Sequence, residues 1–147
     1  MGSLGRRPAR RSLRVLAAVG AGGAIGAVAR YGVAVALPAA PGSFPLATFV
    51  INVTGSVALG VIVTLIIERW PPNEYLRPFV ATGVLGAYTT WSTFMVDADN
   101  LFRGGHPAVA IGYLAASLAA GLGGAYGGIL LARSGPARLR KNRAEDG

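Results

Sequence analysis

Four long apolar stretches constrain the fold of this chain more than any other feature of its sequence. A helix needs roughly 20 residues to cross a bilayer core of about 30 Å, and each stretch is long enough. They run from Leu13 to Leu37, from Pro45 to Ile67, from Phe79 to Phe102 and from Pro107 to Ala132. Proline and glycine mark the short connections between them. The sequence therefore predicts an all-α integral membrane protein with four transmembrane helices.

Charged residues lie almost entirely outside these stretches and make up only 14% of the chain. No segment remains for a soluble domain, so we expect a transmembrane domain at residues 13–132 between basic tails at 1–12 and 133–147. The net charge of +8 does not indicate binding to nucleic acid, because the basic residues lie mainly in the two tails and form no basic face on a folded domain. The absence of cysteine excludes disulfides and thiolate chemistry.

The basic residues also predict an orientation in the membrane. Twelve of the 14 Lys and Arg residues fall in the N-terminal tail and helix start, the second connection and the C-terminal tail, whereas the opposite side has only Arg103. We therefore expect a multi-pass protein of the cell inner (plasma) membrane. The positive-inside rule places both of its termini in the cytoplasm. The first stretch contains Arg30 and three more stretches follow it, so we interpret it as a retained helix and not as a signal peptide.

Two of the predicted helices carry stripes of polar or small side chains at four-residue intervals. The stripes are Thr48, Asn52 and Ser56 in the second helix and Tyr113, Ser117 and Gly121 in the fourth. Polar groups on one face of a membrane helix either join helices by hydrogen bonds or line a narrow path. A path of amide and hydroxyl donors suits a small, strongly hydrated anion, because the donors replace its water shell without trapping it. The stripes alone leave both interpretations open.

The third apolar stretch contains a polar run near its middle. Gly83 and Gly86 precede the residues Thr89–Phe94. Irregular backbone at this depth is tolerated where it is buried in protein or lines a cavity, and it frees carbonyl oxygens that can coordinate Na⁺. An unwound turn would also bring Trp91 and Phe94 to one side, where ring edges can contact an anion; packing of both rings against lipid or helices is the alternative. We predict a helix broken near the membrane midplane.

Arg30 shares one face of the first helix with Gly22 and Gly26. Small residues at this spacing let helices approach closely in lipid. An ionisable group within a span faces protein, water or the interface. Arg30 therefore either reaches the interface as an anchor or lines a vestibule.

Three segments taken together resemble the CrcB (Fluc) family of fluoride channels. They are Gly22–Tyr31, Thr48–Ser56 and Gly86–Phe94, the last followed by Asp97. The resemblance extends over all four predicted helices, and the Asn52 segment and the Thr-Thr-aromatic-Ser-Thr-Phe segment are jointly specific in this order. The resemblance implies an antiparallel dimer with two pores that exports cytoplasmic fluoride passively.

The same resemblance implies which residues would line the fluoride pore. They are Asn52, Phe94, Trp91, Tyr113, Ser117, Thr48, Ser92 and Thr93. In the family picture, Asn52 would hydrogen-bond the ion, and the rings of Phe94 and Trp91 would present their edges to it. Tyr113 and Ser117 would continue the polar track, and Thr48 and Ser92 or Thr93 are further candidates.

The resemblance further implies a structural Na⁺ at the dimer interface, held by the backbone carbonyl groups of Gly86 and Thr89 from both subunits. Arg30 would lie in a vestibule near a pore entrance. Two positions depart from the family pattern. Trp91 stands where the family usually has Phe, and Gly121 stands where a hydroxyl group would continue the polar track.

The charge bias bears on how such a dimer would assemble. An antiparallel homodimer requires one sequence to insert in both directions, and a strong bias opposes this. We therefore expect dimerisation with an oppositely oriented paralogue, and a homodimer stays open as the alternative.

Two other functions compete with a channel. A proton-coupled exporter of the four-helix multidrug type needs a membrane-embedded carboxylate, and here Asp97 and Asp99 lie towards the end of the third helix. A non-conducting partner subunit stays open because of Trp91 and Gly121. We do not expect an enzyme, because the sequence holds no set of nucleophile, base and acid.

Overall fold

The computed structural model describes residues 6–69 and 73–134, and the regular elements within these residues are all helices. Three of them are long and apolar enough to span a membrane: α1 (Arg6–Ala36, apolar from Arg11), α2 (Leu46–Glu68) and α5 (Pro107–Ser134). These helices agree closely with the first, second and fourth predicted spans. The main difference is at the start of α1, which begins at Arg6 and not at Leu13.

The third predicted span is built from three pieces in place of one long helix. They are the π-helical segment η1 (Pro78–Leu85), the short turn α3 (Gly86–Tyr88) and α4 (Trp91–Arg103). Between α3 and α4 the backbones of Thr89 and Thr90 are extended, with ψ angles of 156° and 119°. The predicted interruption is therefore present, and it falls on two β-branched residues, which favour extended backbone. That this broken segment crosses the membrane stays a prediction.

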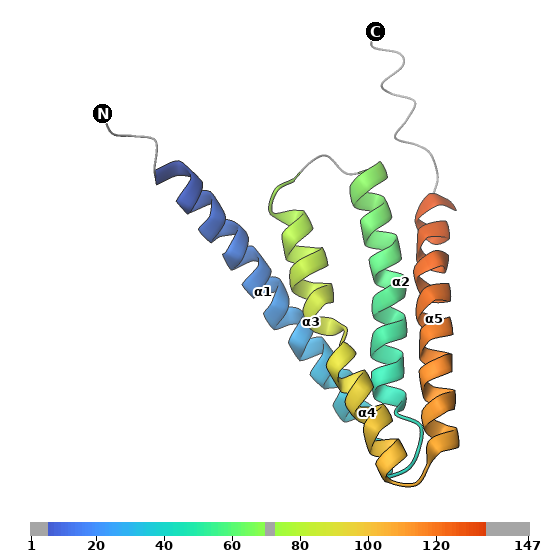
Figure 1. Ribbon diagram of the computed structural model, residues 1–147. Coiled ribbons are helices and arrows are strands. Elements are labelled where there is room, and N and C mark those ends of the chain that lie inside the picture. The colour runs from blue at the N-terminus through green and yellow to red at the C-terminus, as the bar shows by residue number, and fades with distance from the viewer. Residues whose placement is uncertain (1–5, 70–72, 135–147) are drawn as a thin grey trace.

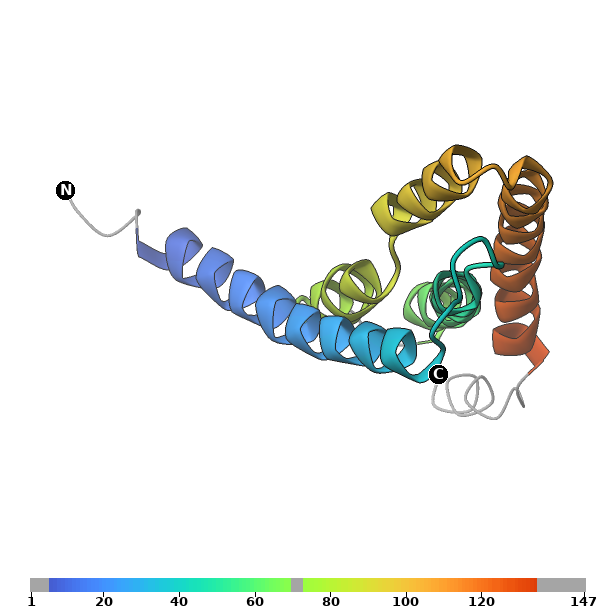
Figure 2. The same cartoon turned by 90° about the horizontal axis from the view of Figure 1, so that it is seen from below.

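The helices form two closely packed groups, and parts of the broken segment contact both of them (Figure 1). In one pair α2 and α5 run side by side and parallel, and in the other α1 crosses η1 and α3 obliquely. Seen from below, α2 lies between the broken segment and α5, while α4 turns towards the lower end of α5 (Figure 2). The break between α3 and α4 therefore faces α2, the helix that carries the stripe of Thr48, Asn52 and Ser56.

Glycines set how closely both pairs approach. A Cβ atom added at Gly26 of α1 would lie 2.1 Å from the carbonyl oxygen of Val84 in η1. One added at Gly128 of α5 would lie 2.3 Å from the carbonyl oxygen of Val57 in α2. Since neither distance leaves room for a methyl group, the helices touch backbone to backbone at these points.

Two ion pairs lie at the end of the bundle where α2 and α5 terminate. Arg133 donates to the carboxylate of Glu68 at 2.7 Å and so joins α5 to α2, and Arg11 of α1 pairs with Glu74. Arg103 lies at the opposite end, in the last turn of α4 (Figure 1). The described arginines are thus distributed as the sequence predicts. The basic residues after Ser134 lie outside the described residues.

Candidate functional site

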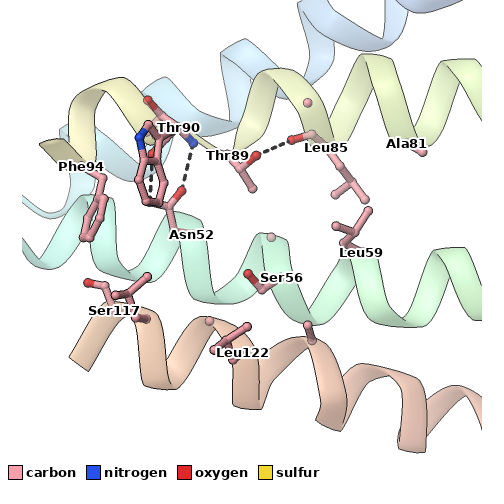
Figure 3. Close-up of a pocket in the computed structure, with 16 residues that line it drawn as sticks. Asn52, Ser56, Leu59, Ala81, Leu85, Thr89, Thr90, Phe94, Ser117 and Leu122 are labelled. Carbon is pink, nitrogen blue, oxygen red and sulfur yellow. Dashed lines mark hydrogen bonds between the residues drawn. The ribbon is translucent and has the colours of Figure 1, made fainter. Parts of the chain in front are cut away.

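A cavity of about 440 Å³ lies beside the helix break, between α2, α5 and the broken segment (Figure 3). We call it the main cavity. It brings together four of the predicted pore residues and both predicted Na⁺ ligands: Asn52, Trp91, Phe94, Ser117, Gly86 and Thr89. None of the described residues that line it is charged. The lining is largely aliphatic, with a few polar groups set into it.

Asn52 bridges the break with both ends of its carboxamide. Its Oδ1 accepts a hydrogen bond from the backbone N–H of Thr90 at 2.9 Å, and its Nδ2 donates to the carbonyl oxygen of Thr90 at 3.0 Å (Figure 3). The interruption of the helix leaves the N–H of Thr90 without its helical acceptor, and Asn52 replaces that acceptor. The carbonyl group of Thr90, the N-cap residue, also begins the hydrogen bonding of α4. A carboxamide has two N–H groups, so one donor of Asn52 is left over for a ligand.

The same contacts release two backbone carbonyl groups. In an unbroken helix, the N–H of Thr90 would donate to Gly86 and the N–H of Thr93 would donate to Thr89. Here the first donates to Oδ1 of Asn52, and the second donates to Oγ1 of Thr90 at 3.2 Å. The carbonyl groups of Gly86 and Thr89, which the sequence resemblance singles out, thereby lose the donors that a continuous helix would provide.

The aromatic side chains around the break form a connected row. The ring centroids of Trp91 and Phe94 are 5.2 Å apart, and those of Phe94 and Tyr113 are 5.1 Å apart. Phe94 is buried and points from α4 towards Ser117 on α5 (Figure 3). Trp91 is 67% exposed, so most of its indole faces outward from this chain. The two rings do share one side, as the sequence predicted from their spacing.

Ser117 presents a hydroxyl group without a hydrogen-bond partner. Its side chain is buried, and its Oγ makes no hydrogen bond within the described residues. An unpaired buried hydroxyl costs about 1–3 kcal/mol. Ser117 lines the main cavity beside Phe94, with its Oγ atom buried in the cavity wall.

A second cavity, of about 270 Å³, lies on the other side of the break, and we call it the side cavity. Arg30 of α1, Thr48 of α2 and Thr93 of α4 line it. Thr90 lines both cavities. The extended backbone at the break is therefore part of the wall between a space that contains an arginine and a space without charged side chains.

Two of the predicted pore residues line neither cavity. Tyr113 is completely buried, and its hydroxyl group donates to Asp97 at 3.4 Å; Thr48 also donates to Asp97, at 2.6 Å. Ser92 is exposed and shares a 3.3 Å hydrogen bond with the hydroxyl group of Thr90. Whether Tyr113 and Ser92 contact an ion stays a prediction.

Thr90 and Asp97 are central to this site, although they were not among the predicted site residues. Thr90 holds the start of α4 by accepting from the N–H of Thr93, which is the role of an N-cap residue. A threonine three residues before another polar residue, inside an apolar stretch, is a readable signal for such a cap. Asp97 could have been found as the acidic group on the same helix face as Phe94 and Thr93.

Side chains of the types that usually bind metals are not grouped here. Within residues 6–69 and 73–134, no three His, Cys, Asp or Glu side chains lie close enough to hold a metal ion. A cation at the break would therefore depend on carbonyl and hydroxyl oxygens.

Residues 17–129 match the family model described as "CrcB-like protein, Camphor Resistance (CrcB)". The chain is 47% identical over 135 residues to "Fluoride-specific ion channel FluC 3" of Streptomyces avermitilis, covering 88% of this chain and 66% of that protein. The chain thus spans about two thirds of the length of this relative.

Two further relatives are matched over more of their length. "Fluoride-specific ion channel FluC 2", also of Streptomyces avermitilis, is 45% identical over 119 residues, which cover 77% of this chain and 75% of that protein. "Fluoride-specific ion channel FluC" of Rhodospirillum centenum is 42% identical over 123 residues, covering 83% of this chain and 98% of that protein. The names of these relatives describe ion channels and not enzymes.

Proposed function

Because the chain belongs to the CrcB family, we propose that it is a multi-pass membrane subunit of a fluoride-selective channel, through which cytoplasmic fluoride leaves the cell passively. Such a channel would relieve fluoride toxicity. The observation that carries this proposal is the helix break held by Asn52 beside a cavity that Phe94 and Ser117 line. These groups offer an anion an amide donor, a hydroxyl donor and a ring edge.

The ion would move between the two cavities past the break. Arg30 gives the side cavity a positive charge that attracts an anion, as expected of a vestibule. In the main cavity the ion would meet uncharged donors only, which replace its water shell and still let it leave. Thr90, which lines both cavities, marks the point of passage.

The released carbonyl groups of Gly86 and Thr89 fit the structural Na⁺ that the family resemblance implies. Carbonyl oxygens freed by a broken helix are suitable ligands for Na⁺. Two carbonyl groups supply only part of the oxygen shell of a hard cation, so a second subunit would have to complete it. When bound, the ion would hold the two breaks together at the dimer interface. Both carbonyl groups belong to residues that line the main cavity, which supports this assignment.

The partner in this dimer would be an oppositely oriented paralogue. Twelve basic residues on one side of the membrane favour a single orientation with both termini in the cytoplasm. Two paralogues of one organism occur among the relatives, so one organism can contain more than one member of the family. The exposed face of Trp91 beside the main cavity is a surface that such a partner would cover.

Fluoride release from liposomes tests the proposal. The purified chain, alone and with a candidate paralogue, is reconstituted into liposomes loaded with fluoride or with chloride. We expect fast release of fluoride and at least 100-fold slower release of chloride, which corresponds to about 3 kcal/mol of discrimination. Equal release of both anions would contradict the proposed selectivity. Release only with the paralogue's pore residues intact would identify the chain as a non-conducting partner subunit.

Two variants connect the flux to the site. Asn52→Ala removes the bridge across the break, and Phe94→Ile removes a ring edge, so both should abolish fluoride release. Phe102→Ile is the matched control for the second variant, because Phe102 lies on α4, is 46% exposed and lines neither cavity. Wild-type rates for Asn52→Ala and Phe94→Ile would exclude the main cavity as the pathway.

A further inference from the structure

A second side-chain contact holds the helix break, and it involves residues that line neither cavity. Tyr88 is the last residue of α3, and its hydroxyl oxygen lies 2.9 Å from Oγ1 of Thr54 on α2. Neither residue lines the main cavity or the side cavity. The contact lies next to the bridge between Asn52 and Thr90, two residues later in α2 and two residues earlier in the broken segment.

The direction of this hydrogen bond follows from the other contacts of Thr54. Its hydroxyl group donates to the carbonyl oxygen of Val50, one turn earlier in α2, at 2.6 Å. A threonine hydroxyl has a single proton. Tyr88 is therefore the donor and Thr54 the acceptor.

Gly55 provides the space for this contact. A Cβ atom added at Gly55 would lie 2.3 Å from Cγ2 of Thr89 and 3.3 Å from Cδ1 of Tyr88. Both side chains thus lie directly on the backbone of α2. Asn52 fixes Thr90 and Thr54 fixes Tyr88, so the extended residue Thr89 is held from both sides.

We propose that Thr54 and Tyr88 are positioning residues of the ion pathway, which fix the end of α3 against α2 and thereby set the direction of the Thr89 backbone at the break. This inference rests on the proposed function. Losing the hydroxyl group of Tyr88 would leave Thr90 held but would let Thr89 rotate. The ion path would then be altered although no residue that lines it had changed.

The variants Tyr88→Phe and Thr54→Val test this proposal in the liposome assay. We expect either variant to release fluoride roughly five-fold more slowly, the effect of losing one ordinary hydrogen bond. The fraction of liposomes that release fluoride should stay at the wild-type value. The double variant should be no slower than either single variant, because both changes remove the same bond.

Tyr126→Phe is the matched control, because Tyr126 is exposed on α5 and makes no hydrogen bond within the described residues. We expect it to release fluoride at the wild-type rate. A smaller fraction of active liposomes with an unchanged rate would contradict the proposal, since the pair would then only support folding. Additive slowing by the two single changes would contradict it as well.

Fluorescence of Trp91 provides a measurement that does not depend on conduction. The chain has two tryptophans, so Trp70→Phe leaves Trp91, the first residue after the break, as the single reporter. In this background we expect Tyr88→Phe to change the quenching of Trp91 by acrylamide, whereas Tyr126→Phe should not. If the wild-type chain released no fluoride either alone or with the paralogue, the proposed function would fail, and unchanged quenching would separately overturn the positioning role.

Discussion

Asn52 illustrates how one side chain can make irregular backbone tolerable inside an apolar bundle. An unpaired backbone group away from water costs about 1–3 kcal/mol, and the break leaves the N–H of Thr90 without its helical acceptor, next to the carbonyl group that begins α4. The carboxamide of Asn52 pairs with both at 2.9 and 3.0 Å. Its position on the polar stripe of α2 was readable from the sequence. Its partner was not, because the pairing depends on where α3 ends.

We expect the hydroxyl group of Ser117 to lower the stability of the protein and to speed the release of fluoride. Its buried hydroxyl group has no partner within the described residues, so Ser117→Ala removes a desolvated donor without breaking a bond. We expect a free energy of unfolding that is unchanged or higher by up to about 1 kcal/mol, together with slower fluoride release. Thermal denaturation in detergent and the liposome assay measure the two quantities.

Thr64→Val is the matched control for the stability of the Ser117 variant. Thr64 is also a buried hydroxyl residue of a long helix, but its hydroxyl group donates to the carbonyl oxygen of Gly60 at 2.7 Å. Removing this satisfied bond should not stabilise the protein or slow release. A Ser117→Ala variant that melts at a clearly lower temperature would show that its hydroxyl group has a structural partner.

At the scale of the elements, the long helices were predictable and the details of the broken segment were not. Length and apolar character alone define α1, α2 and α5 to within a few residues at most ends. The polar run in the third stretch correctly indicated an interruption. However, the glycines of the sequence lie at residues 83–86, whereas the backbone is extended at Thr89 and Thr90. There, the side chain of Asn52 and the N-cap residue Thr90 replace the helical hydrogen bonds. The π-helical segment η1, which packs against α1, was not predicted either.

Several residues of the candidate site were predictable from the sequence, but their distribution between the main cavity and the side cavity was not. The sequence placed Asn52 and Ser117 on polar stripes, and both line the main cavity. Thr48 belongs to the same stripe as Asn52, yet it lies in the side cavity and donates to Asp97. Only the position of the break decides which residues of one stripe belong to which cavity.

Close packing of α1 on η1 leads to a prediction about two glycines of one helix. Gly26→Ala would place a methyl group 2.1 Å from the carbonyl oxygen of Val84, so α1 must move away and the variant should lose about 2–4 kcal/mol of stability. Gly20→Ala is the control, because nothing lies within 4 Å of its added Cβ atom. Alanine favours the helix there by up to about 1 kcal/mol. Equal melting temperatures of the two variants would show that α1 does not pack tightly on η1.

At the scale of the whole molecule, the charge distribution makes its two ends unequal. Arg11 and Arg133 pair with Glu74 and Glu68 at one end of the bundle, and Arg103 lies at the other. These two ion pairs are exposed and contribute little to stability. The arginines in these pairs belong to the end that carries the excess of basic residues.

Reporter enzymes fused to each terminus would test this orientation in cells. We expect both fusions to report the cytoplasm in nearly all molecules, because the basic residues of the tails and of the second connection favour that side. Replacing arginines of both tails by neutral residues should give a mixed population. Equal amounts of both orientations in the unchanged protein would remove the basis for an oppositely oriented paralogue and favour a homodimer.

The contact between α2 and α5 also determines when the molecule can be completed during synthesis. Because the two helices are far apart in the chain, α2 is made well before the helix whose backbone it will touch at Gly60 and Gly128. Until α5 leaves the ribosome, the wall of the main cavity that α5 provides is missing, and Ser56 on α2 has no α5 opposite it. A nascent chain at this stage contains α2, α3 and α4, which form the break, but it lacks α5, which closes the main cavity. The cavity can therefore form only after the last helix has been made.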